Sequence, residues 1–192
     1  MDRKIDRRTR YTQSVIKKIF IELLREKPIE KITVTEICKT AEINRGTFYT
    51  HFNDPYDLLR QIEMEHGDRM VASLERMLPE NGESVFDMDL AALIHKTIRD
   101  DATLQFLAST RPSSTNILQR LFEGLASILK PRLVDKYGFS EEEAHAIYTF
   151  LFSGYHAMDS YFMNRKTAPE KVEKIKKIVN GIVRRGFPSR KA

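Results

Sequence analysis

Residues 33–52, TVTEICKTAEINRGTFYTHF, combine two short helical patterns with a polar turn between them. Thr33 and Glu36 have the spacing of an N-cap and its capping-box partner, so we expect a helix to begin there. Its apolar side chains recur at intervals of three and four residues and share one face: Val34, Ile37, Cys38 and Ala41. Asn44 is a second N-cap candidate, and the two phenylalanines that follow, four residues apart, would face inward from a second helix.

Two helices this short have too little apolar surface to fold alone, so the pair needs a third helix to pack against. Residues 9–27 supply it, because their apolar side chains keep helical spacing until Pro28 ends the run. Together, residues 9–52 predict a helix-turn-helix, a unit that presents its second short helix to the major groove of DNA.

The outward face of that second helix is polar and aromatic. Arg45 can reach a guanine edge or a phosphate, and Tyr49 can touch a thymine methyl or donate to a phosphate. His51 lies angularly close to Phe48, so an edge-of-core role is its alternative. We take eight residues as candidate DNA contacts: Thr33, Thr35, Arg45, Gly46, Thr47, Tyr49, Thr50 and His51.

The charge distribution agrees with a nucleic-acid role. Residues 1–52 hold 12 Lys and Arg against 7 Asp and Glu, whereas residues 53–192 hold 20 of each. A basic excess confined to one segment indicates an anionic partner for that segment. Arg7, Arg8 and Arg10 precede or open the first helix, where the helix dipole disfavours cations. They would form an arm on the DNA backbone, and the alternative is a solvated tail.

The motif residues resemble the TetR family of bacterial transcriptional regulators. The resemblance rests on the capped start at residues 33–37, on Asn-Arg-Gly-Thr-Phe-Tyr-Thr-His-Phe at residues 44–52, and on Leu58-Leu59 in the next helix. It covers about residues 9–60 and implies a regulator, usually a repressor, that binds a double-stranded palindromic operator as a homodimer. Two positions depart from the family pattern. Glu42 occupies a turn position usually held by glycine, and Pro55 replaces a lysine that often contacts a DNA phosphate, so that phosphate contact is in doubt.

The rest of the chain has helical periodicity and no sustained strand alternation, which predicts an all-α fold of about nine helices. After residue 52 we expect helices over about residues 55–78, 85–99, 101–109, 117–137 (bent or broken at Pro131), 140–164 and 167–185. We expect an N-terminal helix-turn-helix domain over residues 1–53. Residues 54–192 would form a helical domain for effector binding and dimerisation.

The last two predicted helices carry wide apolar stripes, and the resemblance implies that they form a dimer. The candidate interface residues are Phe150, Gly154, Ala157, Tyr161, Ile175, Ile178, Val179 and Ile182. The alternative is that both stripes pack on their own domain.

The resemblance also implies a cavity for a small-molecule effector in the central helices. The candidate lining residues are His95, Phe106, Phe122, Tyr155, Met158 and Asp159. His95, Tyr155 and Asp159 are the better candidates, because a polar group on a mostly apolar helix needs a partner. Core packing is the alternative for the whole set. A second hypothesis is a DNA-bound adaptor whose C-terminal domain binds a protein instead of a small molecule.

Other functions find little support in the sequence. Its five histidines are scattered without metal-site spacing, and no phosphate-binding glycine loop or nucleophile motif occurs. We therefore expect no enzyme activity, metal or cofactor. Cys38, the one cysteine, lies on an apolar stripe and excludes an internal disulfide. Without a signal peptide or an apolar run of membrane-spanning length, we expect a cytoplasmic protein that does not enter a membrane.

Overall fold

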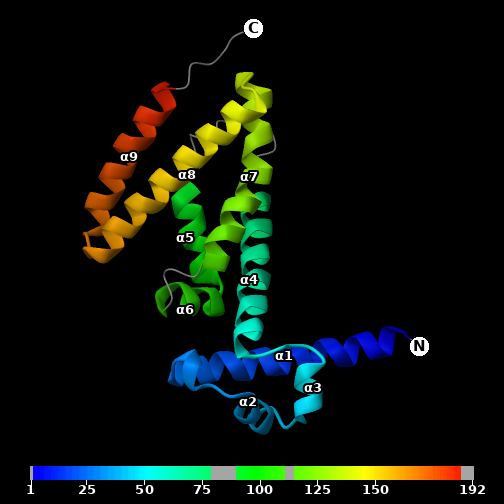
Figure 1. Cartoon of the computed structure of the whole chain (residues 1–192). Helices are drawn as coiled ribbons and strands as arrows, with labels where there is room; N and C mark the ends of the chain where they lie inside the picture. Colours follow the sequence, from blue (N-terminus) through cyan, green and yellow to red (C-terminus); the bar gives the residue numbers. More distant parts are fainter. Residues whose placement is uncertain (1, 79–89, 111–114, 187–192) are drawn as a thin grey trace. The chain divides into compact units, whose positions relative to one another are not determined.

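The computed structural model describes residues 2–78, 90–110 and 115–186 (Figure 1). These residues form nine α-helices and one short 3-10 helix and contain no strand, which confirms the all-α prediction. The bounds are α1 Asp2–Glu26, η1 Ile29–Lys31, α2 Val34–Thr40, α3 Arg45–Tyr49, α4 Pro55–Met77, α5 Leu90–Asp100, α6 Ala102–Thr110, α7 Thr115–Tyr137, α8 Glu141–Asn164 and α9 Pro169–Gly186.

The chain divides into two compact units, residues 1–66 and residues 67–192. This division falls inside α4, so that helix contributes its first half to one unit and its second half to the other. The functional boundary after residue 53 stays a prediction. The start expected for a helix at residue 85 lies outside the described residues, and α5 is described from Leu90.

Helix α1 is longer than the sequence analysis expected, since it begins at Asp2 and not near Thr9. Residues 2–8 contain no proline or glycine, and Arg and Lys are good helix formers. Acidic residues at positions 2 and 6 also suit the positive end of the helix dipole. The expected helix start near Thr9 is therefore wrong, and the contact of Arg7, Arg8 and Arg10 with a DNA backbone stays a prediction.

The core of the first unit forms where α2 packs against both α1 and α3 (Figure 1). Its largest fully buried side chains come from all three helices and from the residues that follow α3: Ile16, Phe20, Ile37, Phe48 and Phe52. Each such side chain contributes about 1.5–3 kcal/mol through loss of apolar surface from water. Cys38 is buried with them, and burial raises the pKa of its thiol, which agrees with a core role.

Side-chain caps begin both short helices. The Thr33 hydroxyl oxygen accepts from the Glu36 amide at 3.2 Å, and the Asn44 side chain accepts from the Thr47 amide at 2.7 Å. The Glu36 carboxylate does not complete the predicted capping box, because it pairs with Lys27 instead. The cap at Thr33 is confirmed, and the reciprocal half of the box is wrong.

The turn between α2 and α3 requires a left-handed residue, and Glu42 adopts it with φ 54°. The Ile43 amide donates to the Cys38 carbonyl at 3.0 Å and the Glu42 amide to the Lys39 carbonyl at 3.3 Å, the pattern of a Schellman motif. A side chain at positive φ costs about 1 kcal/mol relative to glycine. The chain therefore keeps the turn geometry despite its unusual residue.

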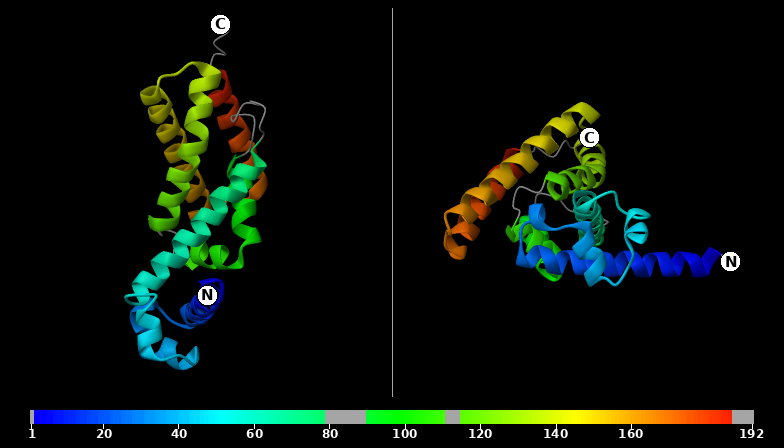
Figure 2. Two further views of the ribbon diagram at one scale, coloured as in Figure 1. Left: turned by 90° about the vertical axis from the view of Figure 1, so that its right-hand side faces the viewer. Right: turned by 60° about the horizontal axis from the view of Figure 1, so that its bottom comes forward.

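The core of the second unit is built mainly from α4, α6, α7 and α8. Its fully buried members include Met70, Leu74, Leu104 and Leu125. Helix α7 packs along α8, and α5 packs against α6. Figure 2 shows the second half of α4 beside α7 from another direction. At Gly124 an added Cβ would lie 2.5 Å from the Val71 side chain, so this glycine permits the close approach of the two helices.

Local signals in the second unit are mostly confirmed. Helix α7 ends at Gly138, which has φ 68°, and Ser140 and Glu143 form a complete capping box with bonds of 2.8 and 3.2 Å. Of the two alternatives at Pro131, a break is wrong, since α7 continues through it to Tyr137, and a bend stays a prediction. Asp101 caps α6 by accepting from two backbone amides at 3.0 Å. None of the helices among the described residues is long and apolar enough to cross a membrane.

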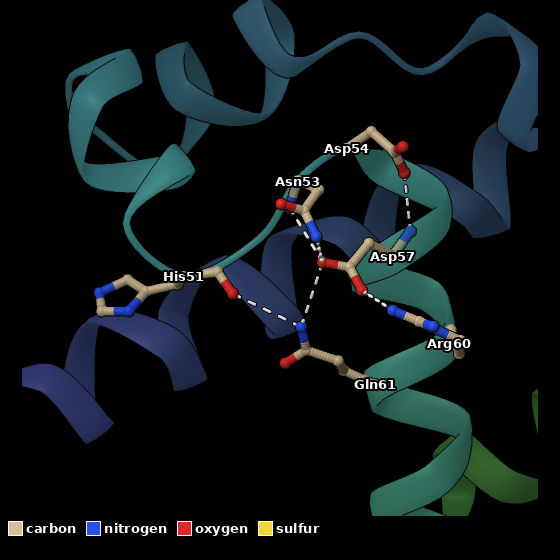
Figure 3. A network of polar contacts seen from close by, with 6 residues as sticks. All are labelled: His51, Asn53, Asp54, Asp57, Arg60 and Gln61. Carbon is tan, nitrogen blue, oxygen red and sulfur yellow. Dashed lines mark hydrogen bonds and ion pairs between the residues drawn. The ribbon is translucent and has the colours of Figure 1, made fainter.

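A polar network joins the segment after α3 to the first turns of α4 (Figure 3). The Asp57 carboxylate accepts from the Asn53 amide at 2.9 Å, from the Asn53 side chain at 3.1 Å and from Gln61 at 3.3 Å, and it pairs with Arg60. The Asp57 side chain is only 7% exposed. These hydrogen bonds, led by that from the Asn53 backbone, lower the pKa of Asp57.

We expect Asp57→Asn to destabilise the first unit by about 1–3 kcal/mol, because the new amide group would turn a donor toward donors. A lowered carboxyl pKa stabilises the fold above the unfolded-state pKa of about 3.9, and this contribution is lost as pH falls through the folded-state value. The difference between wild type and variant should therefore be constant above about pH 5 and shrink below about pH 4.

Urea unfolding followed by circular dichroism at several pH values measures this difference. Asp135→Asn, which changes an exposed carboxylate on α7, is the matched control. Equal free energies of unfolding for wild type and Asp57→Asn at pH 7 would contradict the assigned role of the network.

Candidate nucleic-acid interface

Burial of one side chain determines which face α3 presents to solvent. Phe48 is fully buried, and its ring lies 5.6 Å from that of Phe52, which is also buried. Because consecutive helical residues are rotated by about 100°, the positions on the opposite side must point outward. Gly46 and Thr50 lie on that side and are exposed, and Tyr49 on the flank is 49% exposed. Arg45 is closer in angle to Phe48 but is also exposed, at the first position of α3.

Arg45 and Tyr49 form a pair on this face. The guanidinium Nη2 of Arg45 donates to the Tyr49 hydroxyl oxygen at 3.2 Å, and the guanidinium carbon lies 5.8 Å from the centre of the ring. The Tyr49 ring makes an edge contact with Phe48, with centroids 5.6 Å apart and planes at 88°. The pair is therefore attached to the core through Phe48 while its polar atoms face solvent.

The two threonines of the face use their hydroxyl hydrogens within the helix. Thr47 Oγ1 donates to the Asn44 side chain at 3.0 Å, and Thr50 Oγ1 donates to the Gly46 carbonyl at 2.9 Å. What remains for a ligand is a methyl group and oxygen lone pairs. In chemical terms, the threonines suit apolar contact with a thymine methyl, and Arg45 supplies hydrogen-bond donors to the exposed surface.

Gly46 keeps the start of α3 uncrowded. An added Cβ would lie 3.2 Å from the Asn44 side-chain oxygen that caps the helix, a contact closer than usual. A larger residue would press on the cap and stand between the helix backbone and any ligand. The exposed glycine thus allows a close approach to the N-terminal turn of α3.

The remaining DNA candidates have different surroundings. Thr33 and Thr35 are both exposed at the start of α2, although the Thr33 hydroxyl oxygen is engaged in the cap. His51 is half-buried, with Nδ1 3.4 Å from Gln13 Nε2 of α1 and its ring 6.1 Å from that of Phe52. Its contacts therefore match the edge-of-core alternative more closely than those of the other seven candidates.

In the first turn of α4, Pro55 stands at the position where the sequence pattern often has a lysine, and Tyr56 beside it carries a hydroxyl group. Asp54 accepts from the Asp57 amide at 2.7 Å and so caps the helix, and Pro55 follows it. Arg60 pairs with Asp57 and does not replace the missing lysine. Tyr56 is 54% exposed and Tyr11, on α1, is 70% exposed. Neither tyrosine was a candidate from the sequence, because a single exposed aromatic residue produces no periodic signal.

Two of the effector candidates meet in the second unit. Asp159 on α8 lies 3.4 Å from His95 on α5 and 2.9 Å from Lys176 on α9. Burial raises the pKa of Asp159, but the hydrogen bonds from His95 and Lys176 outweigh it and leave that pKa lowered. Lys176 is only 8% exposed and was missed, because it is one of several lysines on a helix that looks solvated.

The other effector candidates lie elsewhere in the second unit. The Tyr155 hydroxyl donates to the Asn180 side chain at 2.5 Å. Phe122 packs in the core, with ring centroids 5.1 Å from Tyr148 and 5.0 Å from Phe152. Phe106 and Met158 are half-buried. Phe122 thus has the surroundings of a core residue, which was the stated alternative.

The dimer candidates lie on α8 and α9, and most of them are exposed. The exposed fractions are 77% for Phe150, 52% for Tyr161, 54% for Ile178 and 59% for Ile182. Gly154 and Ala157 are exposed between the two aromatic residues, whereas Ile175 and Val179 are half-buried. Both helices therefore carry large apolar side chains that their own chain leaves uncovered.

Comparisons with known proteins agree with this geometry. The family model described as "Bacterial regulatory proteins, tetR family" matches residues 21–62, from the last six residues of α1 into α4. The HTH-type transcriptional activator DhaS of the dhaKLM operon of Lactococcus lactis is 39% identical over 51 residues, 27% of each chain. The HTH-type transcriptional regulator YxbF of Bacillus subtilis is 22% identical over 147 residues, 76% of this chain and 39% of that protein. The matched segments thus cover well under half of both relatives.

A solved structure extends the likeness to the second unit. The fatty acid degradation regulator FadR from Bacillus halodurans superimposes with a TM-score of 0.58 and 19% identity, over 93% of this chain and 97% of that one. At this identity the similarity concerns the fold. The family match over residues 21–62 shows that the helix-turn-helix segment is similar to that of the tetR family of bacterial regulatory proteins, and the solved structure shows a similar fold for the rest of the chain.

Proposed function

We propose that the protein is a ligand-responsive repressor that binds a palindromic operator as a homodimer. The observation that carries this proposal is the exposed face of α3, which the burial of Phe48 orients outward within a matched helix-turn-helix. One such helix covers half a site, so a two-fold dimer would place two of them about 34 Å apart on successive major grooves.

Side chains of α3 would recognise the DNA bases, and nearby cationic side chains would add affinity for the DNA backbone. Arg45 would bind a guanine edge, and the methyl groups of Thr47 and Thr50 would contact thymine methyls. The exposed guanidinium groups of Arg7 and Arg8 on α1, together with Arg10, would bind phosphates. The Tyr56 hydroxyl would donate to a phosphate in place of the lysine missing at Pro55.

We expect Arg45→Ala to weaken operator binding by about 1–3 kcal/mol, roughly 5- to 150-fold, with a smaller effect on unrelated DNA. Operator fragments are first selected from the source genome with the purified protein. Fluorescence anisotropy at fixed salt then compares wild type, Arg45→Ala and the control Arg99→Ala, which removes an exposed arginine from α5. An unchanged operator affinity in Arg45→Ala would refute the assigned DNA face.

The dimer would form through α8 and α9. Phe150 and Tyr161 on α8, with Ile178 and Ile182 on α9, expose apolar surface that a second copy would cover. Between them, Gly154 has no other atom within 4 Å of an added Cβ, which leaves room for a partner helix. Small residues flanked by large ones allow two helices to cross closely.

Ile178→Asp should convert the dimer to a monomer, because it places a charge where an apolar contact is proposed. Operator affinity should fall with it, since the monomer holds only one half-site. Sedimentation equilibrium measures the association state, and Met64→Asp, which alters an exposed methionine on α4, is the matched control. A wild-type monomer, or a dimer that survives Ile178→Asp, would exclude this interface.

Effector response would involve the polar set of α5, α8 and α9. His95, Asp159 and Lys176 join three helices through one carboxylate, so a ligand that replaced one of these contacts would alter their packing. Such a ligand changes operator affinity only through its different affinity for the two conformations, typically by about 1–3 kcal/mol. By linkage, operator DNA must weaken effector binding by the same factor.

His95→Ala should retain operator binding but release the operator less readily when the effector is added. Candidate effectors are the substrates and products of enzymes encoded beside the selected operators. Anisotropy with effector titration measures the coupling, and reporter transcription gives the sign of regulation. If His95→Ala and Tyr155→Phe both respond like wild type, these residues are structural, and an adaptor that binds a protein partner becomes the better hypothesis.

A further inference from the structure

The hydroxyl of Tyr49 accepts a hydrogen bond from Arg45 within α3. Arg45 and Tyr49 lie four residues apart and therefore on the same side of α3. Their hydrogen bond of 3.2 Å joins two exposed side chains. An exposed arginine otherwise samples many rotamers and loses that freedom on binding. A hydrogen bond to a neighbouring side chain restricts this sampling in advance.

We propose that Tyr49 is a positioning residue that sets the direction of the Arg45 guanidinium and thereby sharpens the recognition of one guanine. The inference rests on the proposed DNA-binding role of α3 and adds which residue determines its specificity. Pre-organisation of this kind lowers the entropy cost at the moment of binding. It also favours one approach of the planar guanidinium over others.

The ring of Tyr49 has a contact in the core that fixes its position. Phe48, fully buried, contacts the ring with its plane at 88° and its centroid 5.6 Å away. The Arg45 guanidinium carbon lies 5.8 Å from the centre of the Tyr49 ring, so the cation is near the aromatic ring as well as bonded to its hydroxyl. Arg45 is thus connected to the core of the first unit through the Tyr49 and Phe48 rings, and these contacts set the direction of its guanidinium.

Arg45 has enough N–H donors to bind a base while it stays hydrogen-bonded to Tyr49. A guanidinium has five N–H donors, of which Tyr49 accepts one, and a bidentate contact to guanine O6 and N7 needs two. The Tyr49 hydroxyl accepts from Arg45 through its oxygen. The hydroxyl hydrogens of Thr47 and Thr50 are engaged within the helix and are not available to donate to a base. A change in the direction of the Arg45 guanidinium would therefore lower the specificity for its base pair.

The test is a double-mutant cycle with Tyr49→Phe, Arg45→Ala and the double variant on the selected operator. Tyr49→Phe removes the acceptor and keeps the ring against Phe48, and thermal unfolding confirms that the fold is intact. Each base pair of the half-site is replaced in turn. The pair whose replacement no longer matters in Arg45→Ala is the pair that Arg45 reads.

We expect Tyr49→Phe to reduce discrimination at that pair by about 3- to 10-fold and to leave discrimination at the other pairs unchanged. The double variant should bind like Arg45→Ala alone, because the hydroxyl acts through the arginine. A uniform loss at every sequence, additive with Arg45→Ala, would overturn the proposal and reduce Tyr49 to a phosphate contact. Discrimination that is unchanged in Tyr49→Phe would overturn it too. If Arg45→Ala itself binds like wild type, the assignment of the DNA face fails, which is a different result from failure of the pairing.

Discussion

The buried ring of Phe48 is the contact on which the outward face of α3 depends. Helix α3 spans only Arg45–Tyr49, and a helix of five residues has too few internal hydrogen bonds to be stable in water. Its Asn44 cap and the packing of Phe48 against the core hold it in place. Because one side of so short a helix is fully buried, the direction of every other side chain on it follows.

Local contacts on both sides of α3 reinforce that placement. Before it, the Schellman turn at Glu42 directs the chain from α2 into the Asn44 cap. After it, at the start of α4, the Asp57 carboxylate accepts hydrogen bonds from the Asn53 amide and Gln61 and pairs with Arg60. Helix α3 is thus held by hydrogen bonds near both ends and by one aromatic ring in the middle. Among its outward residues, Thr47 and Thr50 use their hydroxyl hydrogens within the helix, and the Tyr49 ring contacts Phe48.

The second unit distributes its polar groups differently. Its core is apolar, but α5, α8 and α9 are also joined through one half-buried carboxylate, Asp159, and its partners His95 and Lys176. A paired charge of this kind adds little net stability, yet removing one partner leaves the other uncompensated. Such a set is sensitive to any ligand or substitution that competes for the carboxylate, whereas the Phe122 cluster of rings is not.

The sequence by itself determined the features that depend on neighbours within about four residues. Caps at Thr33, Asn44 and Ser140, the end of α7 at Gly138 and the apolar stripes of the helix-turn-helix could all be predicted, because each is a matter of spacing along one helix. The tertiary structure alone decided which distant groups meet. It brought Lys27 to Glu36 in place of the full capping box, turned His51 toward Gln13, and placed Lys176 beside Asp159. Periodicity cannot reveal such pairs, because a charged residue on a helix looks the same in sequence whether its partner is water or a side chain on another helix.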